Sequence, residues 1–163
     1  MLFRSHLKDR TVFITGPAKG MGRAVSLAFA REGARLALVG RDVAAIEPVA
    51  AEARALGVKA VVIACDVTDG DQTEAAVAKA LEAFGSIDVL VNVAGGSGPI
   101  GKTGWETSTD EFNEIVELNM TGCFNTMRAV LPGMIARKDG RIVNVGGTFG
   151  MRGRAGRMAY SAS

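Results

Sequence analysis

Residues 11–22, TVFITGPAKGMG, join a run of β-branched and apolar residues to a glycine-rich turn. The run 11–15 is typical of a buried strand, and apolar residues recur at helical spacing from Met21 to Phe29. Glycines in such a turn permit a tight bend and let the backbone approach a phosphate closely. The helix that follows offers free N–H groups and a positive dipole end at the same place. This stretch therefore predicts a strand, a phosphate-binding turn and a helix.

The alternation of short apolar runs with amphipathic stretches continues along the chain. Further strands are predicted at 35–39, 60–64, 88–93 and 141–145, and helices at 42–56, at 71–84 and from 108 onwards. Continuous apolar strands that alternate with helices imply a parallel sheet covered on both faces. With right-handed crossovers and one reversal of strand order, this is a doubly wound, Rossmann-like α/β fold. We expect residues 1–163 to form a single dinucleotide-binding domain.

Several local details are also predicted. Pro48 requires the second helix either to begin after Asp42 or to kink. Asp71 with Glu74 resembles a capping box, as does Ser108 three residues before Glu111. The apolar face of the long last helix is expected to consist of the following residues: Phe112, Ile115, Val116, Met120, Cys123, Phe124, Met127 and Val130. Pro132 is expected to bend this helix near its end.

Composition narrows the function classes. The net charge is +2, so no basic surface for nucleic acid or acidic lipid is expected. No apolar run approaches the roughly 18 residues that span a bilayer, so we expect no membrane partner. Cys65 and Cys123 lack the spacing of a disulfide framework or a metal site. We therefore expect buried thiols, no metal and a cytoplasmic location.

The glycine spacing, Gly16-x-x-x-Gly20-x-Gly22, resembles the TGxxxGxG signature of the short-chain dehydrogenase/reductase family. Further segments resemble the family's motifs in the family's order: CDV at 65–67, LVNVAG at 90–95, Asn119 in ELNMTG, GRIVNV at 140–145 and YSAS at 160–163. Val93 departs from the pattern, because the family has a second asparagine there.

The resemblance implies an oxidoreductase that moves a hydride between a nicotinamide and a carbonyl or secondary alcohol of a small-molecule substrate. It also implies a homo-oligomer, a dimer or tetramer, formed through the long helix. Together with the residue chemistry, it points to these cofactor-binding residues: Gly16, Ala18, Lys19, Gly20, Met21, Gly22, Arg41, Asp66, Val67, Asn92, Ala94 and Gly95.

The end of the second strand bears on the choice of cofactor. NAD-preferring folds place an acid there to accept from the ribose 2′-OH, whereas this chain has Gly40 followed by Arg41. A guanidinium can hold a 2′-phosphate through two charge-assisted hydrogen bonds, and Lys19 can contact the same phosphate. We therefore favour NADP(H) over NAD(H). The alternative is that Arg41 is a solvated surface residue and Asp42 merely caps the helix.

The resemblance assigns catalysis to Tyr160 and Asn119. A free phenol has a pKa near 10, so proton transfer at neutral pH calls for a nearby cation. The family takes that cation from a lysine four residues after the tyrosine, a position that follows Ser163. Gly147 takes the place of the family's serine, and Thr148, the nearest hydroxyl, is either a stand-in or a loop residue.

We accordingly expect a C-terminally truncated, impaired fragment of an oxidoreductase, with weak cofactor binding and negligible turnover. The alternatives are a non-catalytic nucleotide-binding or interaction module and a subunit scaffold of the same fold.

Overall fold

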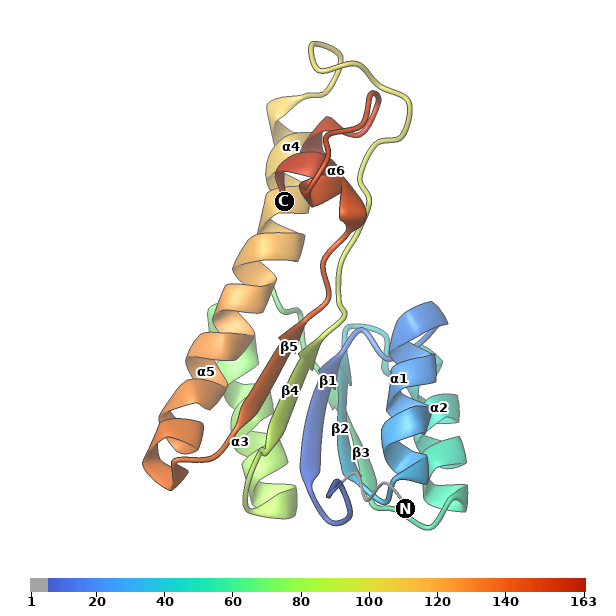
Figure 1. Ribbon diagram of the computed structural model, residues 1–163, viewed down its shortest axis with the longest axis vertical. Helices are drawn as coiled ribbons and strands as arrows, with labels where there is room; N and C mark the ends of the chain where they lie inside the picture. Colours follow the sequence, from blue (N-terminus) through green and yellow to red (C-terminus); the bar gives the residue numbers. More distant parts are fainter. Residues whose placement is uncertain (1–5) are drawn as a thin grey trace.

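A five-stranded parallel sheet forms the centre of the protein, as the computed structural model, which describes residues 6–163, shows (Figure 1). The strands are β1 (Thr11–Thr15), β2 (Arg35–Gly40), β3 (Ala60–Ala64), β4 (Val89–Asn92) and β5 (Arg141–Asn144). Their order is β3-β2-β1-β4-β5. β2 and β3 are added on one side of β1, and β4 and β5 on its other side, so the strand order reverses at β1. Such a reversal leaves a crevice at the carboxyl ends of the strands. The predicted doubly wound fold is confirmed.

Helices cover both faces of the sheet. α1 (Gly20–Arg31) and α2 (Val43–Ala55) lie on one face, and α3 (Gly70–Phe84) and α5 (Gly122–Arg137) on the other (Figure 1). Neighbouring strand residues point to opposite faces, so Val12 and Ile14 pack into the α1–α2 core and Phe13 into the α3–α5 core. No helix within residues 6–163 is both long enough and apolar enough to cross a membrane.

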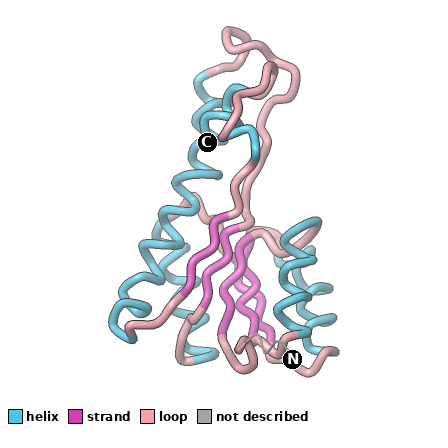
Figure 2. Tube along the Cα trace, viewed as in Figure 1, coloured by secondary structure: helices cyan, strands magenta, loops and turns pink. Residues whose placement is uncertain are grey.

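One long helical segment extends beyond the sheet. It consists of α4 (Thr109–Val116), a π-helical turn η1 (Glu117–Thr121) and α5. At its start, Ser108 Oγ accepts from Glu111 N at 3.1 Å and Ser108 N donates to Glu111 Oε2 at 2.9 Å, which confirms this predicted capping box. A short 3-10 turn η2 (Thr148–Gly150) and α6 (Met158–Ala162) follow β5, and α6 packs against α4 beyond the carboxyl ends of the strands (Figure 2).

One of two helix starts differs from expectation. Asp69, not Asp71, caps α3, because its carboxylate lies just before the first turn and accepts from Gln72 N at 3.0 Å. The predicted Asp71 box is therefore wrong. In α2, Asp42 is the N-cap residue: its Oδ1 accepts from Ala45 N at 3.0 Å, and the helix begins at the next residue, Val43. Pro48 lies inside α2, and Pro132 lies inside α5, which continues to Arg137.

The predicted apolar face of the long helix is buried only in part: Ile115 and Val130 are 5% and 3% exposed, as expected. Met120 and Phe124 are 51% and 57% exposed, and Cys123 is only half-buried, whereas Cys65 is buried. The expectation of a buried Cys123 is therefore wrong. The apolar pattern did not indicate the small and polar residues of α5 that are buried beside Val130: Gly122, Asn125 and Thr126.

The fifth strand forms one edge of the sheet. It pairs only with β4 among the described strands, and three of its four residues are exposed. Within residues 6–163, β5 is therefore an exposed edge strand.

Candidate functional site

The turn between β1 and α1 brings backbone segments into close contact. Gly16 has a φ of +67°, and a Cβ there would lie 2.8 Å from Cα of Ala94. A Cβ on Gly22 would lie 2.9 Å from the carbonyl carbon of Gly16 and closer still to its oxygen. A side chain at either position would push these segments apart, so glycine at 16 and 22 keeps the turn against α1 and the loop after β4.

The start of α1 faces this turn. Lys19 is its N-cap residue and makes no side-chain capping hydrogen bond. The first backbone hydrogen bond of the helix is donated by Arg23 N to Lys19 O at 3.3 Å. The backbone N–H groups of the residues before Arg23 lie in the first turn and therefore have no acceptor within the helix. An anionic group next to this turn can accept from those N–H groups and gains from the helix dipole.

A cavity of about 360 Å³ lies beside the turn, at the carboxyl ends of β1 to β4. Ten of the twelve predicted cofactor-binding residues line it: Gly16, Ala18, Lys19, Met21, Gly22, Arg41, Asp66, Val67, Ala94 and Gly95. Gly20 and Asn92 are not among its lining residues. The fold thus gathers into one cavity residues that follow four separate strands.

Arg41 and Asp66 form an ion pair on the β2–β3 side of this cavity. Arg41 Nη1 lies 3.8 Å from Asp66 Oδ2, and the Arg41 side chain is 73% exposed. Asp66 Oδ1 accepts from Thr68 N at 3.0 Å and from Thr68 Oγ1 at 2.9 Å, which fixes the carboxylate. A long, exposed pair of this kind contributes little to stability. Arg41 is therefore available to an anionic ligand in the cavity.

A second cavity of about 400 Å³ adjoins the first and shares four lining residues with it: Met21, Val93, Ala94 and Gly95. Tyr160 of α6 and Asn119 of η1 line it together with residues 145–147. Among residues 6–163, no side chain that lines this cavity carries a charge. Tyr160 and Asn119, two of the predicted catalytic residues, thus line a cavity next to the predicted cofactor cavity.

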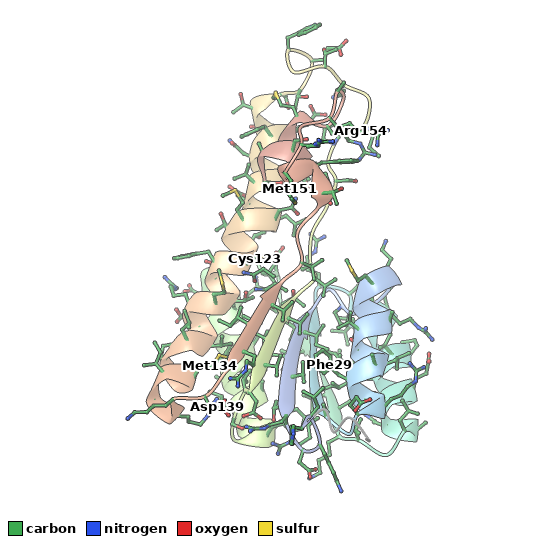
Figure 3. The ribbon with its side chains drawn as sticks, in the orientation of Figure 1. Phe29, Cys123, Met134, Asp139, Met151 and Arg154 are labelled. Atoms are coloured by element: carbon green, nitrogen blue, oxygen red, sulfur yellow. The ribbon has the colours of Figure 1, made fainter. Side chains whose placement is uncertain are left out.

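Cys123 also lines the second cavity, which the sequence analysis missed. Figure 3 shows it on α5 beside the carboxyl ends of the strands, well below Met151 and Arg154 near α6. Burial raises the pKa of its thiol, which keeps the thiol neutral. The sequence did hold a signal for this placement: Cys123 follows Asn119 by four residues, about one helical turn, so the two side chains are expected on the same side of the helix. The hydroxyl-bearing Ser97 and Ser163 line the same cavity and were missed as well.

Asn119 connects the loop after β4 to the end of α6. Its Oδ1 accepts from Gly96 N at 2.8 Å, and its Nδ2 donates to Gly96 O at 3.0 Å and to Ser163 Oγ at 2.8 Å. A π-helical turn such as the one that carries Asn119 frequently marks a functional site. Asn119 thereby fixes the loop relative to the helix that carries Tyr160, and its direct participation in catalysis stays a prediction.

Thr148 lies at the start of η2, where it is exposed and does not line the cavity of Tyr160. Its neighbour Gly147 does line that cavity. The role of Thr148 as a replacement hydroxyl stays a prediction.

Asn92 lies in the sheet near both cavities and is 2% exposed. Its Oδ1 accepts from Thr126 Oγ1 at 2.8 Å, and its Nδ2 donates to Asn144 Oδ1 at 2.9 Å. Thr15 Oγ1 lies 3.5 Å from the same Asn92 Oδ1 and accepts from the backbone N–H groups of the next two residues after Asn92, each at 3.1 Å. Asn92 therefore joins β1, β4, β5 and α5, and a contact with the cofactor stays a prediction.

We expect Asn92→Ala to lower the free energy of unfolding by about 2–4 kcal/mol, because it leaves buried partners unpaired and opens a small void. Urea unfolding followed by circular dichroism measures the change. Asn113→Ala, at an exposed position of α4, is the matched control and should cost well under about 1 kcal/mol. Similar losses in the two variants would contradict a structural role for the Asn92 network.

Comparison with known proteins relates this chain to dehydrogenases and reductases. A family model described as short chain dehydrogenase matches residues 10–163. An uncharacterised oxidoreductase of Myxococcus xanthus is 38% identical over 162 residues, which are 98% of this chain and 62% of that protein. A 3-oxoacyl-(acyl-carrier-protein) reductase of Thermotoga maritima is 34% identical over 157 residues, 96% of this chain and 63% of that protein.

Among solved structures, NAD⁺-bound xylitol dehydrogenase is similar, with a TM-score of 0.93 and 32% identity. The match covers 97% of this chain and 60% of the xylitol dehydrogenase chain. The chain thus spans about three fifths of the length of these three proteins.

Proposed function

The chain belongs to the short-chain dehydrogenase family, and on that premise we propose that it binds an NAD(P)(H) dinucleotide in the cavity beside the Gly16–Gly22 turn. The observation that carries the proposal is the fit of the turn itself. Side chains at Gly16 or Gly22 would collide with backbone, and the uncapped start of α1 presents N–H groups beside the cavity. Both features suit a pyrophosphate that must approach main chain closely.

We further propose that the protein is an oxidoreductase acting on a small-molecule carbonyl or secondary alcohol. When bound, the nicotinamide supplies or accepts the hydride. Tyr160, which lines the adjoining cavity, transfers the proton at the substrate oxygen through its Oη. Asn119 keeps the loop at Gly96 and α6 in place, so that the two cavities stay aligned.

We propose NADP(H) as the preferred cofactor. A Cβ on Gly40 would lie 3.0 Å from Ile46 Cδ1, so an acidic side chain does not fit there without displacing Ile46. Arg41 instead offers a guanidinium, and Lys19 an ammonium group, to the same cavity. Xylitol dehydrogenase, the structural relative above, holds NAD⁺, so the preference rests on these side chains of this chain alone.

Arg41→Ala is expected to weaken NADPH binding by about 10- to 100-fold, since charged hydrogen bonds contribute roughly 1.5–3 kcal/mol each. NADH affinity should change little, because NADH lacks the 2′-phosphate. Calorimetric titration of both cofactors checks this, with Arg31→Ala in the last turn of α1 as the control. If the unsubstituted chain binds NADH as tightly as NADPH, the proposed preference is wrong.

A cytoplasmic homo-oligomer, dimer or tetramer, is proposed for the protein, with residues 1–163 as one dinucleotide-binding domain. The exposed face of α5 supports oligomer formation, because Phe124, Leu131 and Ile135 are 57%, 38% and 69% exposed. Cys65 and Cys123 are both free thiols, which suits a reducing compartment.

A further inference from the structure

The ring of Tyr160 lies directly against the backbone of Gly147. A Cβ on Gly147 would lie 2.8 Å from Cζ and 3.0 Å from Cε1 of Tyr160, and closer still to its Oη. Carbon atoms in favourable contact are about 3.5–4.0 Å apart. The phenol therefore occupies the volume that any side chain at position 147 would need.

The backbone gives no other reason for glycine at this position. Gly147 has φ −87° and ψ 146°, an extended conformation open to every residue type. A Cβ on the preceding Gly146 would meet no atom within 4 Å. Of these two adjacent glycines, only Gly147 is required by a contact, and the contact is with Tyr160.

Other contacts hold Tyr160 in this position. Its ring meets Phe149 edge to face, with centroids 6.1 Å apart and planes at 86°, and Arg154 lies over the Phe149 ring at 5.1 Å. An edge-to-face aromatic pair contributes about 0.5–1.5 kcal/mol beyond its buried area. The neighbouring Ala159 is 4% exposed, which anchors α6. A side chain at 147 would therefore oppose an arrangement that is otherwise well packed.

We propose that Gly147 is a positioning residue, whose missing side chain creates the niche in which Tyr160 places its hydroxyl within the second cavity. A side chain at 147 would require Tyr160 to move away from the position that it has in this structure. The cavity thus presents the Tyr160 hydroxyl in the volume where the family pattern would lead one to expect a serine side chain. The catalytic meaning of this arrangement rests on the proposed function, but the arrangement itself is testable without cofactor or substrate.

Tyr160 is the only tyrosine in the chain, so incorporation of 3-fluorotyrosine labels that ring alone. We expect Gly147→Ala to shift the ¹⁹F resonance and to change the H₂O/D₂O solvent isotope shift, because the ring has to move away from position 147. Gly146→Ala is the matched control and should leave both quantities unchanged. An unaltered resonance in folded Gly147→Ala would overturn the proposal.

A double-mutant cycle keeps the proposal testable if Gly147→Ala folds poorly. Gly147→Ala should lower the urea midpoint when Tyr160 is present and leave it nearly unchanged in a Tyr160→Leu background, because leucine removes the phenol that the new Cβ meets. Equal losses in both backgrounds would contradict the proposed niche. Failure of NADPH to bind, with the ¹⁹F shift as expected, would refute the proposed function and leave the positioning role of Gly147 intact.

Discussion

Tyr160→Phe is expected to abolish the low residual rate of NADPH-dependent carbonyl reduction that this chain sustains, because a positioned general acid usually contributes about 10²–10⁴-fold. The substitution removes the phenolic hydroxyl and keeps the ring. The edge-to-face contact with Phe149 and the packing against Gly147 therefore remain. Steady-state oxidation of NADPH in the presence of a panel of aldehydes and ketones measures the effect in the protein.

The control for this experiment is Trp105→Phe, which changes an aromatic side chain that is 87% exposed and lines neither cavity. It should retain the original rate. The NADPH affinity of Tyr160→Phe should also stay the same, because Tyr160 lines only the second of the two cavities. Undiminished turnover in Tyr160→Phe would show that another group transfers the proton.

Gly22→Ala is expected to abolish detectable NADPH binding. The new Cβ would press on the Gly16 carbonyl, so the turn must open and its N–H groups must move. Overpacking at this buried position should also lower the free energy of unfolding by about 1–3 kcal/mol. A ligand at 100 times its Kd stabilises a protein by about 2.7 kcal/mol, so NADPH should raise the Tm of the original chain and leave that of Gly22→Ala unchanged.

Gly153→Ala serves as the control for the glycine-to-alanine change. A Cβ on Gly153 would meet no atom within 4 Å, and Gly153 lines neither of the two cavities described above. Its Tm should rise with NADPH as in the original chain. A similar NADPH-induced rise in Gly22→Ala would place the cofactor elsewhere in the fold.

The strands were accessible from sequence because β1, β2 and β4 are buried on both faces and are therefore continuous apolar runs. The bounds 11–15 and 60–64 agree with β1 and β3. The glycine turn was accessible for a related reason, since close backbone approach at Gly16 and Gly22 admits one residue type.

Only part of the buried face of the long helix, including Ile115 and Val130, was accessible from apolar periodicity. Gly122, Asn125 and Thr126 are buried there because of close approach and hydrogen bonding rather than hydrophobicity. A Cβ on Gly122 would lie 2.8 Å from Val67 Cγ2, and Asn125 Nδ2 donates to Val67 O at 3.0 Å. An apolar pattern cannot reveal such contacts between segments distant in sequence.

The same limit applies to the catalytic cavity. The motif positions of Asn119 and Tyr160 could be assigned from the resemblance, but their surroundings could not. The contact of Tyr160 with Gly147 and the link from Asn119 to Ser163 join different elements, and they emerge only once β5, α6 and the long helix are packed.

The central claim is that the cavity beside the Gly16–Gly22 turn holds an NAD(P)(H) dinucleotide. Amide hydrogen exchange of the chain with and without saturating NADPH tests it most directly, because the method reports both binding and its location. We predict slower exchange at residues 16–22 and 93–95, where the turn and the loop after β4 line the cavity. Unchanged exchange in these two segments, in a chain whose circular dichroism shows it to be folded, would contradict the claim.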